Sequence, residues 1–174
     1  SRHVSLEQAA QIAAVVPPFV SVVGLFVNAD AQEIAEAVDA AGIDLIQFHG
    51  NECPDYCASH GRPWMRALRM KDDVDLGQAA KEFSAARGLL LDAYRPGVPG
   101  GTGETFDWSR IPATLASRIV LAGGLTPENV ADAVARVKPY AVDVSGGVEA
   151  SPGVKDANKI ARFMQAVRSG EQGQ

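Results

Sequence analysis

Short apolar segments alternate with amphipathic helical patterns along the whole chain. Six of the apolar segments have the length of buried strands and are almost continuously apolar: Val20–Val27, Leu45–His49, Trp64–Met70, Gly88–Tyr94, Ile119–Gly123 and Tyr140–Ser145. Strands that are covered on both faces have this pattern, whereas strands with one wet face alternate apolar and polar residues. The pattern therefore predicts six buried strands.

Helices are predicted between these strands, because residues typical of helix starts precede apolar positions with helical spacing. Ser5 with Gln8 forms a capping-box pattern, Asp30 and Asp156 are candidate N-caps, and Thr126-Pro127 opens another helix. Shorter helices are expected over 55–60 and 73–83, and the polar tail 169–174 is expected to fray. A repeated strand–helix unit requires parallel strands with right-handed crossovers, so the fold class is α/β.

Polar residues or glycines stand at the same end of every predicted strand: Asn28, His49, Arg69, Asp92, Gly123-Gly124 and Asp143 with Ser145-Gly146-Gly147. No strand is followed by a dinucleotide-binding or P-loop glycine pattern, which an open sheet would favour. In a (β/α)8 barrel this end is the active-site face. A complete barrel has eight strands and six are predicted here, so either two strands are missing or the fold is not a closed barrel.

Glycines follow the last two predicted strands, at Gly123-Gly124 and at Ser145-Gly146-Gly147. Glycine exposes backbone N–H groups and permits close approach to an anion, and barrels commonly bind phosphate at these two loops. Tight turns into helices are the alternative explanation for each pair taken alone. Their occurrence after both final strands favours a phosphate site.

Composition narrows the classes of partner. Of 174 residues 16 are Lys or Arg and 21 are Asp or Glu, so the net charge of −5 does not favour binding to nucleic acid or an anionic membrane. The apolar stretch Pro17–Val27 is shorter than the roughly 18 residues of a spanning helix. Two cysteines cannot form a disulfide framework, which favours a reducing, cytoplasmic location. Cys53 and Cys57 with His49 are too few ligands for a metal site, so no metal is expected.

Six blocks of sequence resemble the phosphoribosylanthranilate isomerase family, in the order of that family: Val23–Asn28, Gln47–Glu52, Leu90–Ala93, Gly100–Trp108, Leu121–Val130 and Ala141–Glu149. The segment Ser1–Ser5 is similar to the family's Lys-Ser-x-Arg-Tyr-Val-Ser. The resemblance implies a (β/α)8 TIM barrel, with six of the eight strands present in one incomplete domain over residues 1–174. It also implies a cofactor-free isomerase of tryptophan biosynthesis that performs an Amadori rearrangement on a phosphorylated small molecule.

The resemblance implies a role for several residues. Asp92 is similar to the family's general acid, and Arg2 to the arginine that meets the anthranilate carboxylate. His49 is expected to bind substrate, although a turn histidine is the alternative. Asp143 is expected to bind ribose hydroxyls or to hold loop backbone. The phosphate is assigned to the two glycine loops, where Gly146 replaces a serine that is usual in the family.

The sequence also departs from the family's pattern. The family opens with a strand that carries Lys-x-Cys-Gly-Ile-Thr, whose cysteine is the general base, followed by a helix and a second strand; none of these lies in the 174 residues. This chain alone is therefore expected to be inactive unless another base, with Cys53 as the first hypothesis, replaces that cysteine. Two alternatives stay open, namely a non-catalytic barrel fragment and another phosphate-binding barrel of histidine or tryptophan biosynthesis. The sequence predicts no oligomeric state.

Overall fold

A computed structural model describes residues 3–93 and 105–172. The chain divides into two compact units, the first formed by residues 1–67 with 80–88 and the second by residues 68–79 with 89–174. Strand β3 (Trp64–Met70) contributes residues to both units. The sequence predicts a single domain over residues 1–174, and this stays a prediction.

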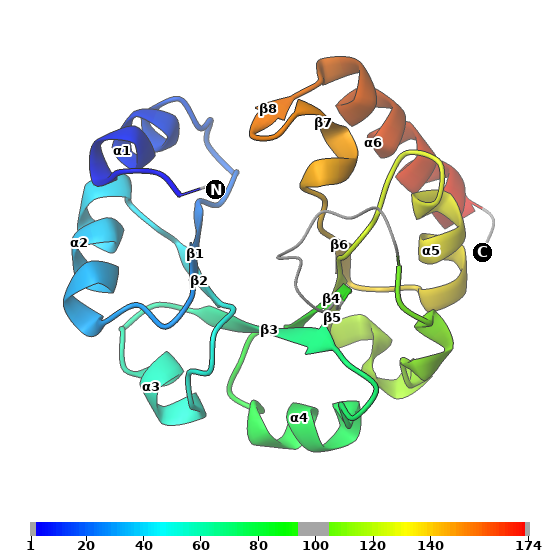
Figure 1. The fold of residues 1–174 in the computed structure, drawn as a ribbon, viewed down its shortest axis with the longest axis horizontal. Coiled ribbons are helices and arrows are strands. Elements are labelled where there is room, and N and C mark those ends of the chain that lie inside the picture. The colour runs from blue at the N-terminus through cyan, green and yellow to red at the C-terminus, as the bar shows by residue number, and fades with distance from the viewer. Residues whose placement is uncertain (1–2, 94–104, 173–174) are drawn as a thin grey trace. The chain divides into compact units, whose positions relative to one another are not determined.

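Six strands form one sheet whose order follows the chain, from β1 to β6 (Figure 1). Besides β3 they are β1 (Val23–Phe26), β2 (Leu45–Phe48), β4 (Leu89–Ala93), β5 (Ile119–Leu121) and β6 (Ala141–Val142). The pairs β1–β2, β2–β3, β4–β5 and β5–β6 are parallel. The predicted α/β class and the number of strands are confirmed, although most strands are shorter than the apolar segments that predicted them.

Burial differs between the inner strands and the first one. Phe48 on β2 is fully buried, and so is Leu91 on β4. Val23 and Leu25 on β1 keep 47% and 55% of their surface exposed, which the apolar pattern did not predict. The physical reason is the position of β1 at the end of the strand order, where it pairs with β2 alone.

Capping explains where the helices of the first unit begin. Ser5 and Gln8 form the predicted capping box at the start of α1 (Leu6–Ala14). The Asp30 carboxylate accepts the N–H of Glu33 at 2.9 Å and starts α2 (Ala31–Ala41). The shorter helices are α3 (Pro54–Ala58) and α4 (Leu76–Glu82), which begins in the second unit.

Helix α5 (Val130–Val137) of the second unit starts later than Thr126-Pro127 predicted. The side chain of Asn129 accepts the N–H of Thr126 at 2.8 Å and donates to the carbonyl of Gly124 at 2.9 Å. These two bonds hold the residues after β5 in a turn, and the helix begins after Asn129. Thr126 still makes a capping bond, because its Oγ1 accepts the N–H of Glu128 at 3.2 Å. The loop after β5 is therefore fixed by a side chain from its own end.

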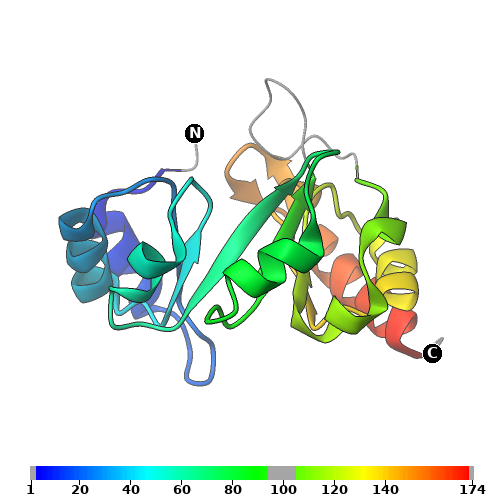
Figure 2. The ribbon, with the colours of Figure 1, turned by 90° about the horizontal axis from the view of Figure 1, so that it is seen from below.

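Helix α6 (Ala157–Gln172) corrects the prediction of a frayed tail, because the helix includes residues 169–172. Gly170 is buried there, where α6 lies against the carbonyl of Ala131 on α5. Figures 1 and 2 both show α5 and α6 side by side. Packing on α5 offsets the entropy that would fray this polar segment. The predicted N-cap Asp156 is confirmed, since its carboxylate accepts the N–H of Asn158 and of Lys159.

Elements that the apolar pattern did not predict connect these parts of the second unit. They are the 3₁₀ helices η1 (Trp108–Arg110), η2 (Ala113–Arg118) and η3 (Gly146–Val148), and a hairpin of β7 (Glu149–Ser151) and β8 (Val154–Lys155). No helix in residues 3–93 and 105–172 has the length and apolar character that crossing a membrane requires.

Candidate functional site

Asp92 is the polar residue at the end of an otherwise apolar strand. Leu89, Leu90 and Leu91 of β4 are each at least 99% buried, whereas Asp92 is half-buried. The next strand continues beside it, because Ala122 donates its N–H to the carbonyl of Leu91 at 2.9 Å. The strand geometry therefore brings a carboxyl group out of the core at the carboxyl end of β4.

Gly123 places backbone directly beside this carboxyl. It has φ of 78°, in the left-handed region, and a Cβ atom built on it would lie 2.8 Å from Asp92 Oδ1 and overlap the backbone nitrogen of Ala93. Glycine is required here both for its backbone conformation and for the close approach. Gly124 follows with φ of 68°, so the left-handed backbone continues for two successive residues.

A second carboxyl, that of Asp143, lies close enough to act on Asp92. Asp143 follows β6 and donates its N–H to the carbonyl of Leu121 at 2.8 Å. Burial raises the pKa of Asp92 first of all, and the negative charge of Asp143 raises that pKa further. The Ala93 N–H and the Arg69 guanidinium act against this rise. At any given pH a larger fraction of Asp92 is therefore protonated than of an ordinary aspartate.

Asp143 has its own environment. Much of the residue is exposed, yet its carboxyl lies deep enough that burial raises its pKa, while the ammonium of Lys155 lowers it. The two carboxyls thus have different charged neighbours, Arg69 for Asp92 and Lys155 for Asp143. Paired carboxyls with unequal environments are typical of sites that use one acid and one anion.

The second glycine loop packs on the first. A Cβ atom on Gly147 would overlap the carbonyl of Leu125, so only glycine fits where η3 meets the loop after β5. Ser145 precedes η3 and does not cap it with its side chain. The first N–H groups of such a helix have no partner within the helix. Within the described residues, the N–H groups of Gly146 and Gly147 therefore suit an anion.

Sequence reasoning missed two charged residues of this region, Lys155 and Glu149. The Nζ atom of Lys155 lies 3.0 Å from the carbonyl oxygen of Ser145 and 2.9 Å from Oε1 of Glu149. Both come from the β7–β8 hairpin, which no apolar pattern indicated. Glu149 belongs to a block that carries the family resemblance, but nothing in that block indicates that Glu149 pairs with Lys155.

His49, the other predicted binding residue within the described part of the chain, belongs to the first unit. It follows β2, donates its N–H to the carbonyl of Phe26 at 2.9 Å, and is half-buried. Its Nε2 atom lies 2.5 Å from Nε2 of Gln47, which precedes it by two residues and faces the same side of the strand. The backbone of His49 is therefore held by Phe26, and its imidazole ring contacts the side chain of Gln47.

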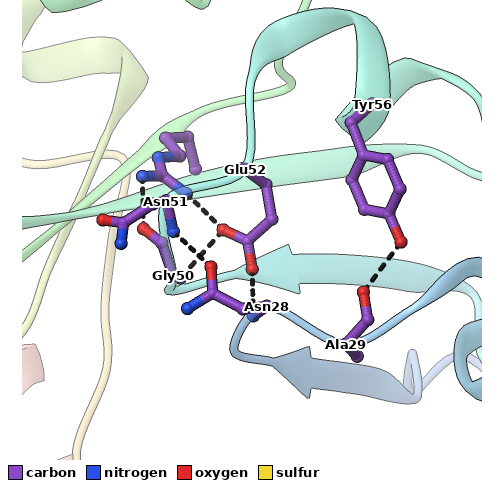
Figure 3. Close-up of polar contacts among 7 residues, drawn as sticks. Asn28, Ala29, Gly50, Asn51, Glu52 and Tyr56 are labelled. Carbon is purple, nitrogen blue, oxygen red and sulfur yellow. Dashed lines mark hydrogen bonds and ion pairs between the residues drawn. The ribbon is translucent and has the colours of Figure 1, made fainter.

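A buried ion pair fixes the loops that follow β1 and β2 (Figure 3). The Glu52 carboxylate accepts the N–H of Asn28 at 2.7 Å, the N–H of Gly50 at 2.8 Å and the guanidinium of Arg66 at 2.7 Å. Arg66 also donates to the carbonyl of Gly50 at 2.6 Å, and Asn28 accepts the N–H of Asn51 at 2.7 Å. The carboxyl ends of β1 and β2 are thereby held together.

The two cysteines have different surroundings. Burial, more than any neighbouring charge, raises the pKa of the Cys57 thiol to about 11, so it stays protonated. Cys53 is exposed at the N-cap of α3. Its role as a replacement for the family's general base stays a hypothesis.

Across the described residues no group of three or more His, Cys, Asp or Glu is arranged to hold a metal ion. Arg2 and the block residues Gly100–Glu104 lie outside the described residues.

Comparison with known proteins decides the family. Residues 1–166 match the family of N-(5'-phosphoribosyl)anthranilate (PRA) isomerase. The curated N-(5'-phosphoribosyl)anthranilate isomerase of Thiobacillus denitrificans is 57% identical over 168 residues, which cover 97% of this chain and 82% of that protein. The chain belongs to the PRA isomerase family. The resemblance of the six sequence blocks is thereby confirmed.

Solved PRA isomerases share the fold. The enzyme from Thermotoga maritima superposes with a TM-score of 0.86 at 36% identity, covering 97% of this chain and 83% of that one. A PRA isomerase in complex with reduced 1-(o-carboxyphenylamino)-1-deoxyribulose 5-phosphate gives a TM-score of 0.82 at 34% identity, with coverage of 97% and 82%. The α/β fold of TIM-barrel type that was expected is confirmed.

Proposed function

We propose that this protein isomerises N-(5'-phosphoribosyl)anthranilate to 1-(2-carboxyphenylamino)-1-deoxyribulose 5-phosphate in tryptophan biosynthesis, with Asp92 as general acid. Membership of the PRA isomerase family supports the reaction. One observation carries the site: Asp92, whose pKa is raised by burial and by Asp143, adjoins the glycine turn at Gly123. The substrate is a phosphorylated small molecule and the reaction needs no cofactor.

An Amadori rearrangement needs an acid and then a base. The acid gives a proton to the ribose ring oxygen while the bond from C1 to that oxygen breaks, and the amine nitrogen forms a protonated Schiff base with C1. The base then removes the proton from C2 to give an enolamine. This enolamine takes a proton at C1 and loses the proton of its C2 hydroxyl, which leaves the ketose. Asp92 suits the first step because its raised pKa preserves the protonated form that can donate.

The remaining residues bind substrate in this proposal. Gly123, Gly124, Ser145, Gly146 and Gly147 hold the phosphate, mainly through backbone N–H groups. Asp143 accepts hydrogen bonds from ribose hydroxyls. His49 contacts the substrate from the loop after β2, and the guanidinium of Arg2 pairs with the anthranilate carboxylate.

The comparisons favour neither alternative. A different phosphate-binding barrel would have to match the PRA isomerase family over residues 1–166 by coincidence. The similarity to 3-hexulose-6-phosphate synthase from Salmonella typhimurium, at 17% identity and a TM-score of 0.65, concerns the fold alone. A cytoplasmic location is part of our proposal, because a phosphorylated substrate does not cross membranes unaided; cell fractionation tests it.

The substitution Asp92→Asn tests the proposed acid. Asparagine keeps the shape of the side chain but cannot donate the proton, so kcat should fall by roughly two to four orders of magnitude while KM changes little. Because the family's general base lies on the segment with Lys-x-Cys-Gly-Ile-Thr, the assay uses these 174 residues joined to that segment. Turnover is followed by the change in anthranilate fluorescence.

The matched control is Asp132→Asn on the exposed face of α5, where the aspartate forms an exposed ion pair with Arg136 four residues on. Its kcat and KM should equal those of the unsubstituted protein. Near-normal turnover by the Asp92→Asn variant would assign the acid elsewhere, with Asp143 as the next residue to substitute. No turnover by the unsubstituted fusion would contradict the proposed reaction itself.

A further inference from the structure

Lys155 ties the β7–β8 hairpin to the loop that begins at Ser145. Its Nζ atom lies 3.0 Å from the Ser145 carbonyl oxygen, 3.4 Å from Ser145 Oγ and 2.9 Å from Glu149 Oε1. An ammonium group has three N–H donors, and three oxygens of this hairpin and loop lie within reach of them. The ammonium therefore joins the Glu149 carboxylate to Ser145, whose carbonyl belongs to the peptide group between Ser145 and Gly146.

Glu149 holds Lys155 in this place. Its side chain is only 6% exposed, whereas that of Lys155 is 45% exposed. The two residues are opposite one another in the antiparallel pair of β7 and β8. A buried carboxylate is stabilised by a charged partner, and the ammonium of Lys155 lies 2.9 Å from Oε1 of Glu149. The ion pair therefore fixes the position of the ammonium.

The contact with the Ser145 carbonyl sets the direction of the next N–H group. In a trans peptide the C=O of one residue and the N–H of the next lie in one plane and point in opposite directions. Lys155 binds the C=O of Ser145, so the N–H of Gly146 must point away from the lysine. Ser145 itself has φ of −120° and ψ of −81°, outside the regular helix and strand regions, and its side chain does not cap η3.

The other end of the same short loop is also fixed. Gly147 packs against the Leu125 carbonyl so closely that a side chain would not fit. The N–H groups of Gly146 and Gly147 therefore lie between two anchors, the Lys155 ammonium on one side and the loop after β5 on the other. The charge of Lys155 also lowers the pKa of Asp143, so it acts on the carboxyl that follows β6 as well.

We propose that Lys155 is a positioning residue, which holds the peptide between Ser145 and Gly146 so that the N–H groups of Gly146 and Gly147 face the phosphate of the substrate. Glu149 acts with it by keeping the ammonium in place. The inference rests on the proposed function, because it assigns a supporting pair to the phosphate site named there. It goes beyond that function because it assigns a positioning role to the β7–β8 hairpin.

The test is a titration of the 174-residue chain with inorganic phosphate, followed by the amide NMR shifts of Gly146 and Gly147. Lys155→Met should weaken phosphate binding by about tenfold, the effect of losing one charge-assisted contact. Glu149→Gln separates positioning from charge. It removes a negative charge, so simple electrostatics would strengthen phosphate binding, whereas loss of positioning weakens it.

Lys138→Met is the matched control, because it removes the same charge at the C-cap of α5 and should leave phosphate affinity within about twofold. A second readout does not depend on phosphate: the carboxyl carbon of Asp143 should titrate at higher pH in Lys155→Met. The partly exposed position of Lys155 keeps this variant informative if Glu149→Gln does not fold.

The outcomes separate the two claims. Unchanged phosphate affinity in Lys155→Met, or tighter binding in a folded Glu149→Gln variant, would overturn the positioning role and leave the phosphate site in place. If phosphate moved neither glycine amide in the unsubstituted chain, the proposed phosphate site itself would be wrong, and the positioning role with it.

Discussion

At the scale of single residues, the pKa of Asp92 depends on its charged neighbours in the second unit. The charge of Asp143 raises the pKa of Asp92, and the charge of Arg69 lowers it. A general acid must be protonated to act, so the rate falls as the pH rises through the pKa of Asp92. The neighbours of Asp92 thus set the upper pH limit of the proposed reaction.

Asp143→Asn should therefore lower the pKa of Asp92. Removal of the neighbouring negative charge makes the Asp92 carboxylate easier to form, and the alkaline limb of the kcat profile should move to lower pH. The carboxyl-carbon chemical shift of Asp92, followed by NMR against pH, measures the pKa directly in the 174-residue chain. Arg69→Met, the opposite change, should raise the same pKa. An unchanged pKa of Asp92 in Asp143→Asn would show that the two carboxyls do not share a site.

The sequence could predict Asp92 because a single carboxylate at the end of an apolar strand is visible without knowledge of its neighbours. Lys155 could not be found in this way, since its role depends on a short bulged hairpin over residues 149–155 that has no apolar alternation. The partnership of Glu52 and Arg66 was equally hidden, because these residues are 14 positions apart and only the pairing of β2 with β3 brings their elements together.

At the scale of elements, the ion pair of Glu52 and Arg66 serves the loops that follow β1 and β2. Burial acts to raise the pKa of Glu52, but the hydrogen bonds from the backbone and from Arg66 outweigh it and hold the pKa below its ordinary value. A carboxyl with a lowered pKa stabilises the fold above its unfolded pKa, and this contribution is lost as the pH falls through the folded pKa. The first unit should consequently lose stability in acid.

Glu52→Gln should lower the free energy of unfolding by about 3–5 kcal/mol at neutral pH, because it leaves the buried Arg66 without a counter-charge. Urea unfolding monitored at several pH values measures the loss, and the variant should depend less on acid than the unsubstituted chain. Glu36→Gln, on the exposed face of α2, is the control and should change stability by less than about 0.5 kcal/mol. Equal stability of the two variants would exclude a structural role for the pair.

Among the elements, those with strong periodicity could be predicted and those set by single side chains could not. The starts of α1 and α2 followed from Ser5 and Asp30, whose capping bonds are local in sequence. The start of α5 was misplaced, because Asn129 bonds backward to Thr126 and Gly124 and keeps a turn where a proline favoured a helix. The helical end of α6 depends on packing against α5, which a polar tail sequence does not reveal.

At the scale of the whole molecule, six similar strand–helix repeats predicted the parallel sheet, since each repeat is local in the chain. The order of its strands came from the structure. The division into two compact units had no counterpart in composition, because no linker or change of charge marks it. The candidate site in the second unit was predictable from the rule that parallel strands end at one edge, which places Asp92, Gly123 and Asp143 at neighbouring strand ends.

The central claim, that these strand ends bind the substrate of a PRA isomerase, is tested most directly by one titration. Isotope-labelled protein is titrated with reduced 1-(o-carboxyphenylamino)-1-deoxyribulose 5-phosphate, the ligand of a solved relative. We predict that the amides of Gly123, Gly124, Gly146 and Gly147 and the carboxyl carbons of Asp92 and Asp143 shift together with one Kd, and that inorganic phosphate competes. Shifts elsewhere in the chain, with these glycine amides and both carboxyls unchanged at saturation, would contradict the account.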